Sequence, residues 1–121
     1  MSDSNYKAEE EGNTQQERFD ALLKRRLKKT QDTLQSKAMM YASSDNRLHN
    51  FDVAARIHNC TPEQALWGMM MKHIVSVLDL VEWSETMPER ITEQLVDEKI
   101  GDTINYLILL EALFLRRGDK S

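Results

Sequence analysis

Apolar residues recur at steps of three and four positions from residue 15 onward, and this helical period constrains the fold more than any other feature. No stretch alternates between apolar and polar residues for long enough to predict a strand. Only 4 glycines and 2 prolines occur among 121 residues, so the pattern is broken at few places. We therefore expect an all-α protein with one core, because a chain of this length commonly forms a single domain.

The breaks in the pattern predict a bundle of four helices. We expect these helices over residues 15–42, 48–59, 62–83 and 88–117. The third has the clearest start, because Thr61 and Gln64 form a capping box around Pro62 in the first turn. It is apolar on nearly every side, which predicts a place in the middle of the bundle. In the fourth, Gly101 predicts a kink or a close helix contact, and Gly118 predicts the end.

The N-terminal segment and the cysteine content indicate where the protein works. Residues 1–14 are acidic and polar and predict a disordered tail before a single helical domain at 15–121. The start of the chain lacks the apolar segment of a signal peptide, and no apolar run reaches the roughly 18 to 20 residues that span a bilayer. Cys60 is the single cysteine, which excludes an intrachain disulfide and suits a reducing compartment. We expect a cytoplasmic protein with no membrane partner.

The charge balance argues against nucleic acid as a partner. The formal net charge is -4, which does not favour a polyanion. A basic run at residues 24–29 is the local exception. We interpret it as a solvated helix face, because Leu22, Leu23 and Leu27 occupy the other side of the same helix. DNA binding through this run would also lack a recognition motif.

A polar stripe on the third predicted helix is the first candidate for chemistry. Lys72, Ser76 and Asp79 are spaced by four and three residues and so share one face. Glu82 follows Asp79 by one more helical step, which places two carboxylates near the end of this helix. Lys72 is suited to contact a phosphate as a point charge.

A second polar stripe lies on the fourth predicted helix, where Glu98, Asp102 and Asn105 share one face. The loop between the third and fourth helices is short, so they should pack antiparallel. The carboxylates of Asp79 and Glu82 would then converge with those of Glu98 and Asp102. Clustered oxygen ligands without cysteine or paired histidines suit a hard cation such as Mg²⁺.

A structural interpretation of the same residues stays open. Acids spaced three or four apart on helices are common and usually face water. An ion pair between Lys72 and an acid of the fourth helix would also satisfy these polar groups without any activity. His73 has no partner at metal-ligand spacing, so we expect it to pack or cap.

The order of several short motifs resembles the MazG-like, all-α nucleotide pyrophosphohydrolases over about residues 30–115. The chain is most similar to small, often phage-borne relatives associated with nucleotide metabolism and DNA modification. The residues that carry the resemblance are Lys37 with Tyr41, Asn50 with Phe51, Ala54 with Ala55, Met71 with Lys72, and the segment 98–106.

The resemblance implies a helical enzyme in which water hydrolyses a nucleoside triphosphate to the monophosphate and pyrophosphate. It implies Mg²⁺ held by acids of two adjacent helices, and commonly a homo-oligomer, in the host cytoplasm if the protein is phage-encoded. Glu98 and Asp102 would then be catalytic, and Asp79 and Glu82 would complete the metal site. The substrate-binding residues would be Lys72 and Asn105 at the phosphate or sugar, and Tyr41, Asn50 and Phe51 at the base.

Two departures from the family pattern leave a second hypothesis. The third predicted helix lacks the family's double-Glu motif with a further Glu three residues later. Lys99 stands where a second Glu is usual, so the acids Glu98 and Asp102 are four positions apart. The alternative is a non-catalytic helical module that sequesters a nucleotide-like ligand or binds and inhibits a host protein.

Overall fold

The computed structural model describes residues 14–40 and 48–119, and it confirms an all-α fold. The helices are α2 (Gln15–Met40), α3 (His49–His58), α4 (Pro62–Thr86), the 3₁₀ turn η1 (Pro88–Arg90) and α5 (Glu93–Asp119). No residue in these two ranges lies in a strand. The tail predicted at residues 1–14 falls almost entirely outside the described part. None of the described helices combines the length and apolar character needed to cross a membrane.

Local interactions explain where α4 begins. The Thr61 hydroxyl accepts the backbone N–H of Gln64 at 3.1 Å, and the Gln64 side chain accepts the backbone N–H of Thr61 at 3.0 Å. Pro62 occupies the first helical position, where its missing N–H costs nothing. The predicted capping box is therefore confirmed. Just before it, α3 ends at His58 and is capped by Asn59, whose φ of 55° is the left-handed conformation that closes many helices.

The fourth helix begins later than the sequence predicts. Pro88 starts the separate short turn η1, and α5 begins only at Glu93. Between them Thr92 acts as a cap, because its hydroxyl accepts the backbone N–H of Leu95 at 3.1 Å. The helix also continues through Gly118 instead of ending before it.

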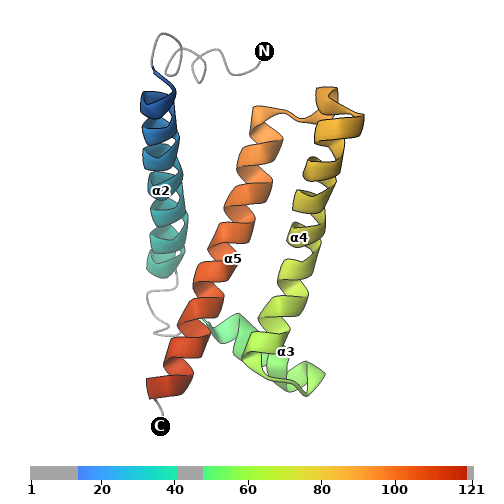
Figure 1. The fold of residues 1–121 in the computed structure, drawn as a ribbon. Coiled ribbons are helices and arrows are strands. Elements are labelled where there is room, and N and C mark those ends of the chain that lie inside the picture. Colours follow the sequence, from blue (N-terminus) through green and yellow to red (C-terminus); the bar gives the residue numbers. More distant parts are fainter. Residues whose placement is uncertain (1–13, 41–47, 120–121) are drawn as a thin grey trace.

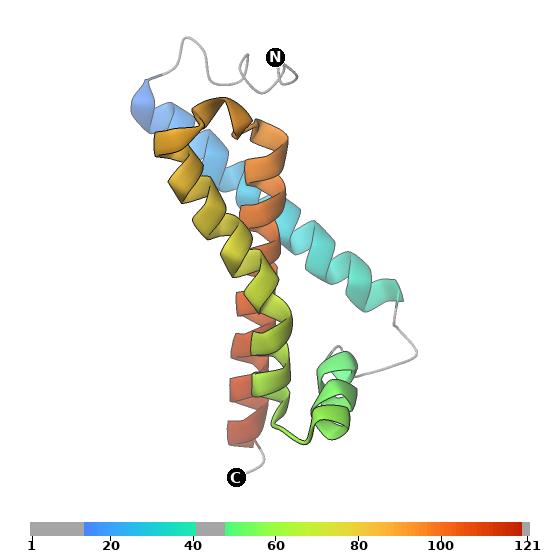
Figure 2. The same ribbon diagram turned by 90° about the vertical axis from the view of Figure 1, so that its right-hand side faces the viewer.

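Helix α5 lies between α2 and α4 and contacts both (Figure 1). Helices α4 and α5 run antiparallel, with η1 at their connection, and α3 packs against α4. Figure 2 shows α2 crossing the α4–α5 pair at an angle; among the described helices it contacts α5 alone. Helix α4 in turn lies between α3 and α5 and contacts both. Its outer face is left uncovered, with Leu78 and Val81 exposed, so the prediction that it is enclosed in the middle is wrong on that side.

The apolar core lies where α3, α4 and α5 meet. Its buried members are Leu48, Phe51, Leu66, Met70 and Leu113. A second cluster of small residues, Ala54, Ala55 and Ala65, allows a close contact between α3 and α4. In the described part of the chain, α2 contributes no buried apolar residue, and its one buried residue is Thr30. The attachment of α2 to α5 therefore depends on polar side chains.

Two bidentate ion pairs hold the C-terminal end of α5 against its neighbours. Arg116 donates to both carboxylate oxygens of Asp52 on α3, at 3.0 and 2.8 Å. Arg117 does the same to Glu63 on α4, at 3.0 and 2.7 Å. The hydrogen bond from Arg117 holds the pKa of Glu63 below its ordinary value, although burial acts in the opposite direction.

Candidate functional site

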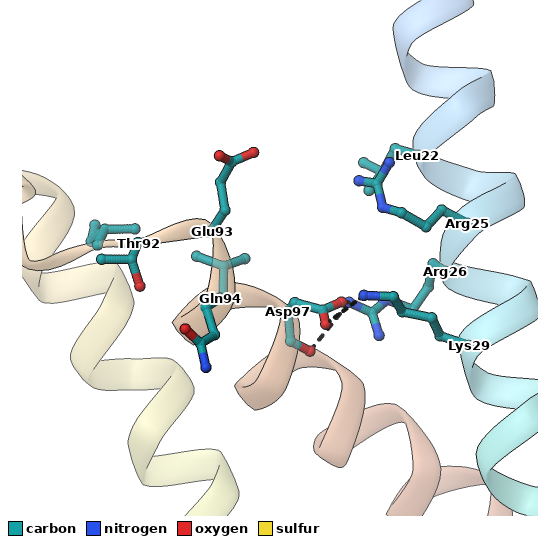
Figure 3. A pocket seen from close by; sticks show the side chains of 10 residues that line it. Leu22, Arg25, Arg26, Lys29, Thr92, Glu93, Gln94 and Asp97 are labelled. Atoms are coloured by element: carbon teal, nitrogen blue, oxygen red, sulfur yellow. Dashed lines mark hydrogen bonds and ion pairs between the residues drawn. The ribbon is translucent and has the colours of Figure 1, made fainter. Parts of the chain in front are cut away.

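Charged side chains join α2 to α5. The Arg26 guanidinium donates to both the backbone carbonyl and the carboxylate of Asp97, and the Lys29 ammonium donates to the same carboxylate at 2.8 Å. Figure 3 shows the two cations and the carboxylate pointing toward one another from the two helices. Asp97 is 71 positions from Arg26 in the sequence, so these contacts are purely tertiary.

Asp97 is the anion shared by these two cations. Burial by itself would raise its pKa, but the hydrogen bond from Lys29 and the charge of Arg26 outweigh burial and hold the pKa of Asp97 below its ordinary value. The carboxylate is therefore ionised at neutral pH. It holds the positively charged groups of Arg26 and Lys29 on one side of the contact between α2 and α5.

Gly101 allows the close approach of Arg26 to α5. A methyl group at this buried position would lie 2.6 Å from Nη1 of Arg26, closer than the two atoms can pack. Of the kink and the close helix contact predicted at Gly101, the structure shows a contact with α2 that is made by the end of the Arg26 side chain. The glycine weakens α5 by about 1 kcal/mol relative to alanine, and the space it leaves is filled by the guanidinium.

Two pockets that share Arg26, Lys29 and Asp97 lie along this contact, and we call them together the α2–α5 groove. The larger, the basic pocket, has a volume of about 480 Å³. Its lining is Leu22, Arg25, Arg26, Lys29, Ile91, Thr92, Glu93, Gln94, Val96 and Asp97. The smaller, the polar niche, has a volume of about 140 Å³. Its lining is Arg26, Lys29, Thr30, Thr33, Asp97, Glu98, Gly101, Asp102 and Asn105.

The polar niche holds two buried oxygen atoms without hydrogen-bond partners in the described part of the chain. They are Oγ1 of Thr30, a residue only 8% exposed, and Oδ1 of Asn105. Buried polar atoms are paired in the great majority of cases, and an unpaired one costs about 1 to 3 kcal/mol. Thr30 and Asn105 both line a pocket that also contains carboxylates and cations.

Asp102 also contacts α4 through a histidine. Oδ2 of Asp102 lies 3.6 Å from Nδ1 of His73, whose side chain is 14% exposed. The imidazole packs on Tyr106 with ring centroids 5.0 Å apart. The expectation that His73 packs is confirmed. The structural alternative in which Asp102 pairs with Lys72 is not what the structure contains, since Lys72 is exposed and forms no ion pair with the described residues.

Eight of the predicted site residues have described side chains, on α3, α4 and α5, and three of them come together. Glu98, Asp102 and Asn105 all line the polar niche. The exposed residues Lys72, Asp79 and Glu82 line neither pocket of the groove. Within residues 14–40 and 48–119, no three acidic, histidine or cysteine side chains form a group that could hold a metal ion. The predicted convergence of four carboxylates is therefore wrong for the single chain.

The phase of α4 explains this difference. Its buried residues Leu66, Met70 and Leu80 define the face that meets the rest of the molecule. Asp79 and Glu82 lie about half a turn away from that face, given about 3.6 residues per turn. They are neighbours on α4, as predicted, but they point away from the core instead of toward α5.

The residues predicted to hold a base are not at the groove. Phe51 is 7% exposed and belongs to the core, where its ring packs edge-on against Tyr106 at 6.5 Å between centroids. Its burial is the physical reason that a base-binding role for Phe51 is wrong here. Asn50 is exposed on α3 and lines neither pocket. Tyr41 lies outside the described residues.

Sequence reasoning missed the contribution of α2. The interpretation of residues 24–29 as a solvated face holds for Lys24 and Lys28, which are exposed, but Arg26 and Lys29 reach Asp97 on α5. Arg26, Lys29 and Thr33 share one face of the helix by their spacing, but further polar residues lie on that face, so the sequence alone does not mark it as a contact surface. Recognising it required knowing which helix would face it.

Comparisons of this chain with protein-family models, with characterised proteins and with solved structures found no match.

Proposed function

We propose that this chain is a MazG-like nucleotide-binding protein that takes its ligand in the α2–α5 groove. The observation that carries the proposal is the meeting of Glu98, Asp102 and Asn105 in one polar niche with two unpaired buried oxygens. Polar groups that are buried and unpaired in a folded chain point to an occupant that pairs them. A nucleotide with a bound cation offers both hydrogen-bond donors and positive charge.

The residues of the niche fit a single hard cation. Glu98 and Asp102 offer carboxylates, and Oδ1 of Asn105 offers a neutral oxygen without a partner in the described chain. Mg²⁺ is commonly held by one or two protein carboxylates, while waters and substrate phosphates complete its shell. When bound, the ion would supply positive charge that polarises a phosphoryl oxygen. Glu98 and Asp102 would hold it, and His73 Nδ1 lies 3.6 Å from the carboxylate of Asp102.

The bound nucleotide could be hydrolysed or only held, and binding without hydrolysis is the second candidate function. It is favoured by the position of Asp79 and Glu82, which are exposed on the outer face of α4 and do not join the two carboxylates of the niche. The family's pyrophosphohydrolase activity uses acids of two adjacent helices. In this chain, we propose that nucleotide binding is the primary function, with pyrophosphate release as the reaction to test.

Calorimetric titration of the full chain with each nucleoside triphosphate tests the proposal, with Mg²⁺ and then with a chelator. We expect Mg²⁺-dependent binding that Asp102→Asn weakens at least about tenfold, equivalent to about 1.4 kcal/mol. The amide keeps a polar contact with His73, so the thermal midpoint without metal should change little. Release of pyrophosphate in the same samples separates turnover from sequestration.

Glu111→Gln is the matched control, because it removes an exposed carboxylate from the same helix outside the groove. We expect its nucleotide affinity to equal that of the unaltered chain. If Asp102→Asn and Glu111→Gln weakened nucleotide affinity equally, the affinity would depend only on the overall charge of the chain. Absence of binding for every nucleotide tried would overturn the proposal.

A further inference from the structure

The basic pocket is a second concentration of chemistry in the groove, beyond the carboxylates of the niche. Arg25, Arg26 and Lys29 line it from α2, and the first turn of α5 lines it from the other side (Figure 3). Two carboxylates, those of Glu93 and Asp97, face these three cations. The lining therefore carries a net positive charge in a chain whose formal net charge is -4.

The cations retain donors for a ligand. Lys29 uses one of its three N–H groups on Asp97, and Arg26 bonds to Asp97 through Nη2 alone. The shared carboxylate holds both side chains in place, so they are ordered before a ligand arrives. An anion that enters beside Asp97 would therefore meet side chains that are already partly ordered. Binding would then cost less conformational entropy.

The start of α5 adds partial positive charge to the same pocket. The first N–H groups of a helix have no acceptor within the helix, and the Thr92 hydroxyl accepts that of Leu95. The helix dipole favours an anion at this end. Thr92 and Gln94 both line the basic pocket, so the N-terminal turn lies beside the cations of α2.

An independent observation points to an occupant of the groove. The hydroxyl of Thr30 is buried without a partner in the described residues, and Thr30 itself is only 8% exposed. It lines the polar niche, which shares Arg26 and Lys29 with the basic pocket. A ligand that extends from one pocket into the other would lie beside Thr30 and would meet the remaining cationic donors of Arg26 and Lys29.

We propose that the basic pocket binds the phosphate chain of a diphosphate or triphosphate ligand. A pocket of about 480 Å³ is in the range of small-molecule sites, which is about 300 to 1,000 Å³. The inference rests on the proposed function, because it places the phosphate end of the same nucleotide. It assigns the phosphate contacts to cations of α2 instead of to Lys72, which is exposed on α4. It requires no metal ion.

Titration of the full chain with inorganic pyrophosphate, at low salt and with a chelator present, tests the inference. We expect measurable binding, and Lys29→Gln should weaken it by about tenfold, because hydrogen bonds between a cation and a phosphate are among the strong ones. Lys28→Gln is the matched control. It removes the same charge one residue away, where the side chain is 77% exposed and pairs with Asp32, and it should weaken binding less than about twofold.

Gly101→Ala provides a second variant that alters no charge. Its added methyl would displace the Arg26 guanidinium, so pyrophosphate binding should fall by about threefold or more while α5 gains helix propensity. Circular dichroism checks that each variant folds. Equal weakening by Lys28→Gln and Lys29→Gln, or no binding of pyrophosphate to the unaltered chain, would overturn the inference.

Two further arms separate the possible sources of phosphate and the two proposals. A short single-stranded oligonucleotide should bind more weakly than pyrophosphate; tighter binding that Lys24→Gln and Lys28→Gln both reduce would instead indicate a nucleic-acid surface and overturn the inference. Glu111→Gln, outside both pockets of the groove, should leave metal-free pyrophosphate binding unchanged. For the unaltered chain, pyrophosphate binding without any Mg²⁺-dependent nucleotide binding would refute the proposed function alone, and Mg²⁺-dependent nucleotide binding without pyrophosphate binding would refute this inference alone.

Discussion

At the scale of single residues, the contact between α2 and α5 depends on one glycine and one carboxylate. Gly101 leaves the space that the Arg26 guanidinium occupies, and Asp97 binds both Arg26 and Lys29. Charged pairs of this kind add modestly to stability when they are partly exposed, and the Asp97 side chain is 38% exposed. Their larger effect is on position, because they determine which face of α2 lines the groove.

Asp97→Asn should lower stability in a pH-dependent manner. The pKa of Asp97 is below its ordinary value in the folded chain, so its pairing stabilises the fold above the ordinary carboxyl range and is lost as pH falls through the folded pKa. We expect a thermal midpoint about 2 to 6 °C lower at pH 7, with the difference shrinking as the pH falls below the ordinary carboxyl range. Asp32→Asn, in an exposed pair with Lys28, should show a smaller shift. An equal difference at all pH values would contradict the pairing.

Leu66→Ala should destabilise the core strongly. Leu66 has no exposed surface, and its truncation leaves a cavity where α3, α4 and α5 meet. The expected loss is about 2 to 5 kcal/mol in the free energy of unfolding, measured by urea denaturation. Ile57→Ala, at a position 73% exposed on α3, should cost less than about 0.5 kcal/mol. Similar losses of unfolding free energy for Leu66→Ala and Ile57→Ala would show that Leu66 does not lie in the core.

At the scale of elements, α3 is the helix that most depends on its neighbours. It has 10 residues, and isolated helices shorter than about 12 to 15 residues are marginal in water. Phe51, Ala54 and Ala55 anchor it through burial, and Asp52 ties it to Arg116 at the end of α5. The pairing also raises the pKa of Arg116, primarily through the hydrogen bond to Asp52.

Asp52→Asn should loosen α3 in particular. The change removes a bidentate, charge-assisted pair whose side chains are 30% and 21% exposed, which we expect to cost about 1.5 to 3 kcal/mol. Amide hydrogen exchange should accelerate in α3 more than in the middle of α4. A double-mutant cycle with Arg116→Met isolates the pair. Additive losses in that cycle would mean that the two side chains do not interact.

At the scale of the whole molecule, the described chain leaves a large apolar surface uncovered. On α4 it includes Val75, Leu78 and Val81, at 48%, 61% and 63% exposure. On α2, Phe19 and Leu27 are 58% and 60% exposed. Extended apolar surface of this kind is rare on monomeric proteins and is typical of interfaces. The sequence predicts that this face of α4 is buried in the middle of a bundle, but the face is exposed in the structure.

We expect this surface to be covered by self-association, with a homodimer as the simplest closed assembly. Sedimentation at about 10 to 100 µM should show a species larger than the monomer, and the thermal midpoint should rise with concentration. Leu78→Lys combined with Val81→Lys should shift the protein to monomer while circular dichroism remains helical. A monomer across this range, with unaltered sequence, would contradict the prediction and leave a host protein as the candidate partner.

The sequence by itself determined the helices and the residues that share a face within each. The start of α4 follows from contacts among Thr61, Pro62 and Gln64, all within one turn. The shared face of Glu98, Asp102 and Asn105 follows from the helical repeat, and all three line the polar niche. Such features depend on neighbours a few residues away, so a local pattern is sufficient to predict them.

Only the tertiary structure decided which faces meet. Asp79 and Glu82 share a face of α4, but the burial of Leu66, Met70 and Leu80 turns that face away from α5. Nothing near the basic run on α2 indicates that Arg26 and Lys29 pair with Asp97, about 70 positions later in the sequence. Helix phase relative to a partner depends on how the whole core packs, and pairs so distant in sequence leave no periodic trace.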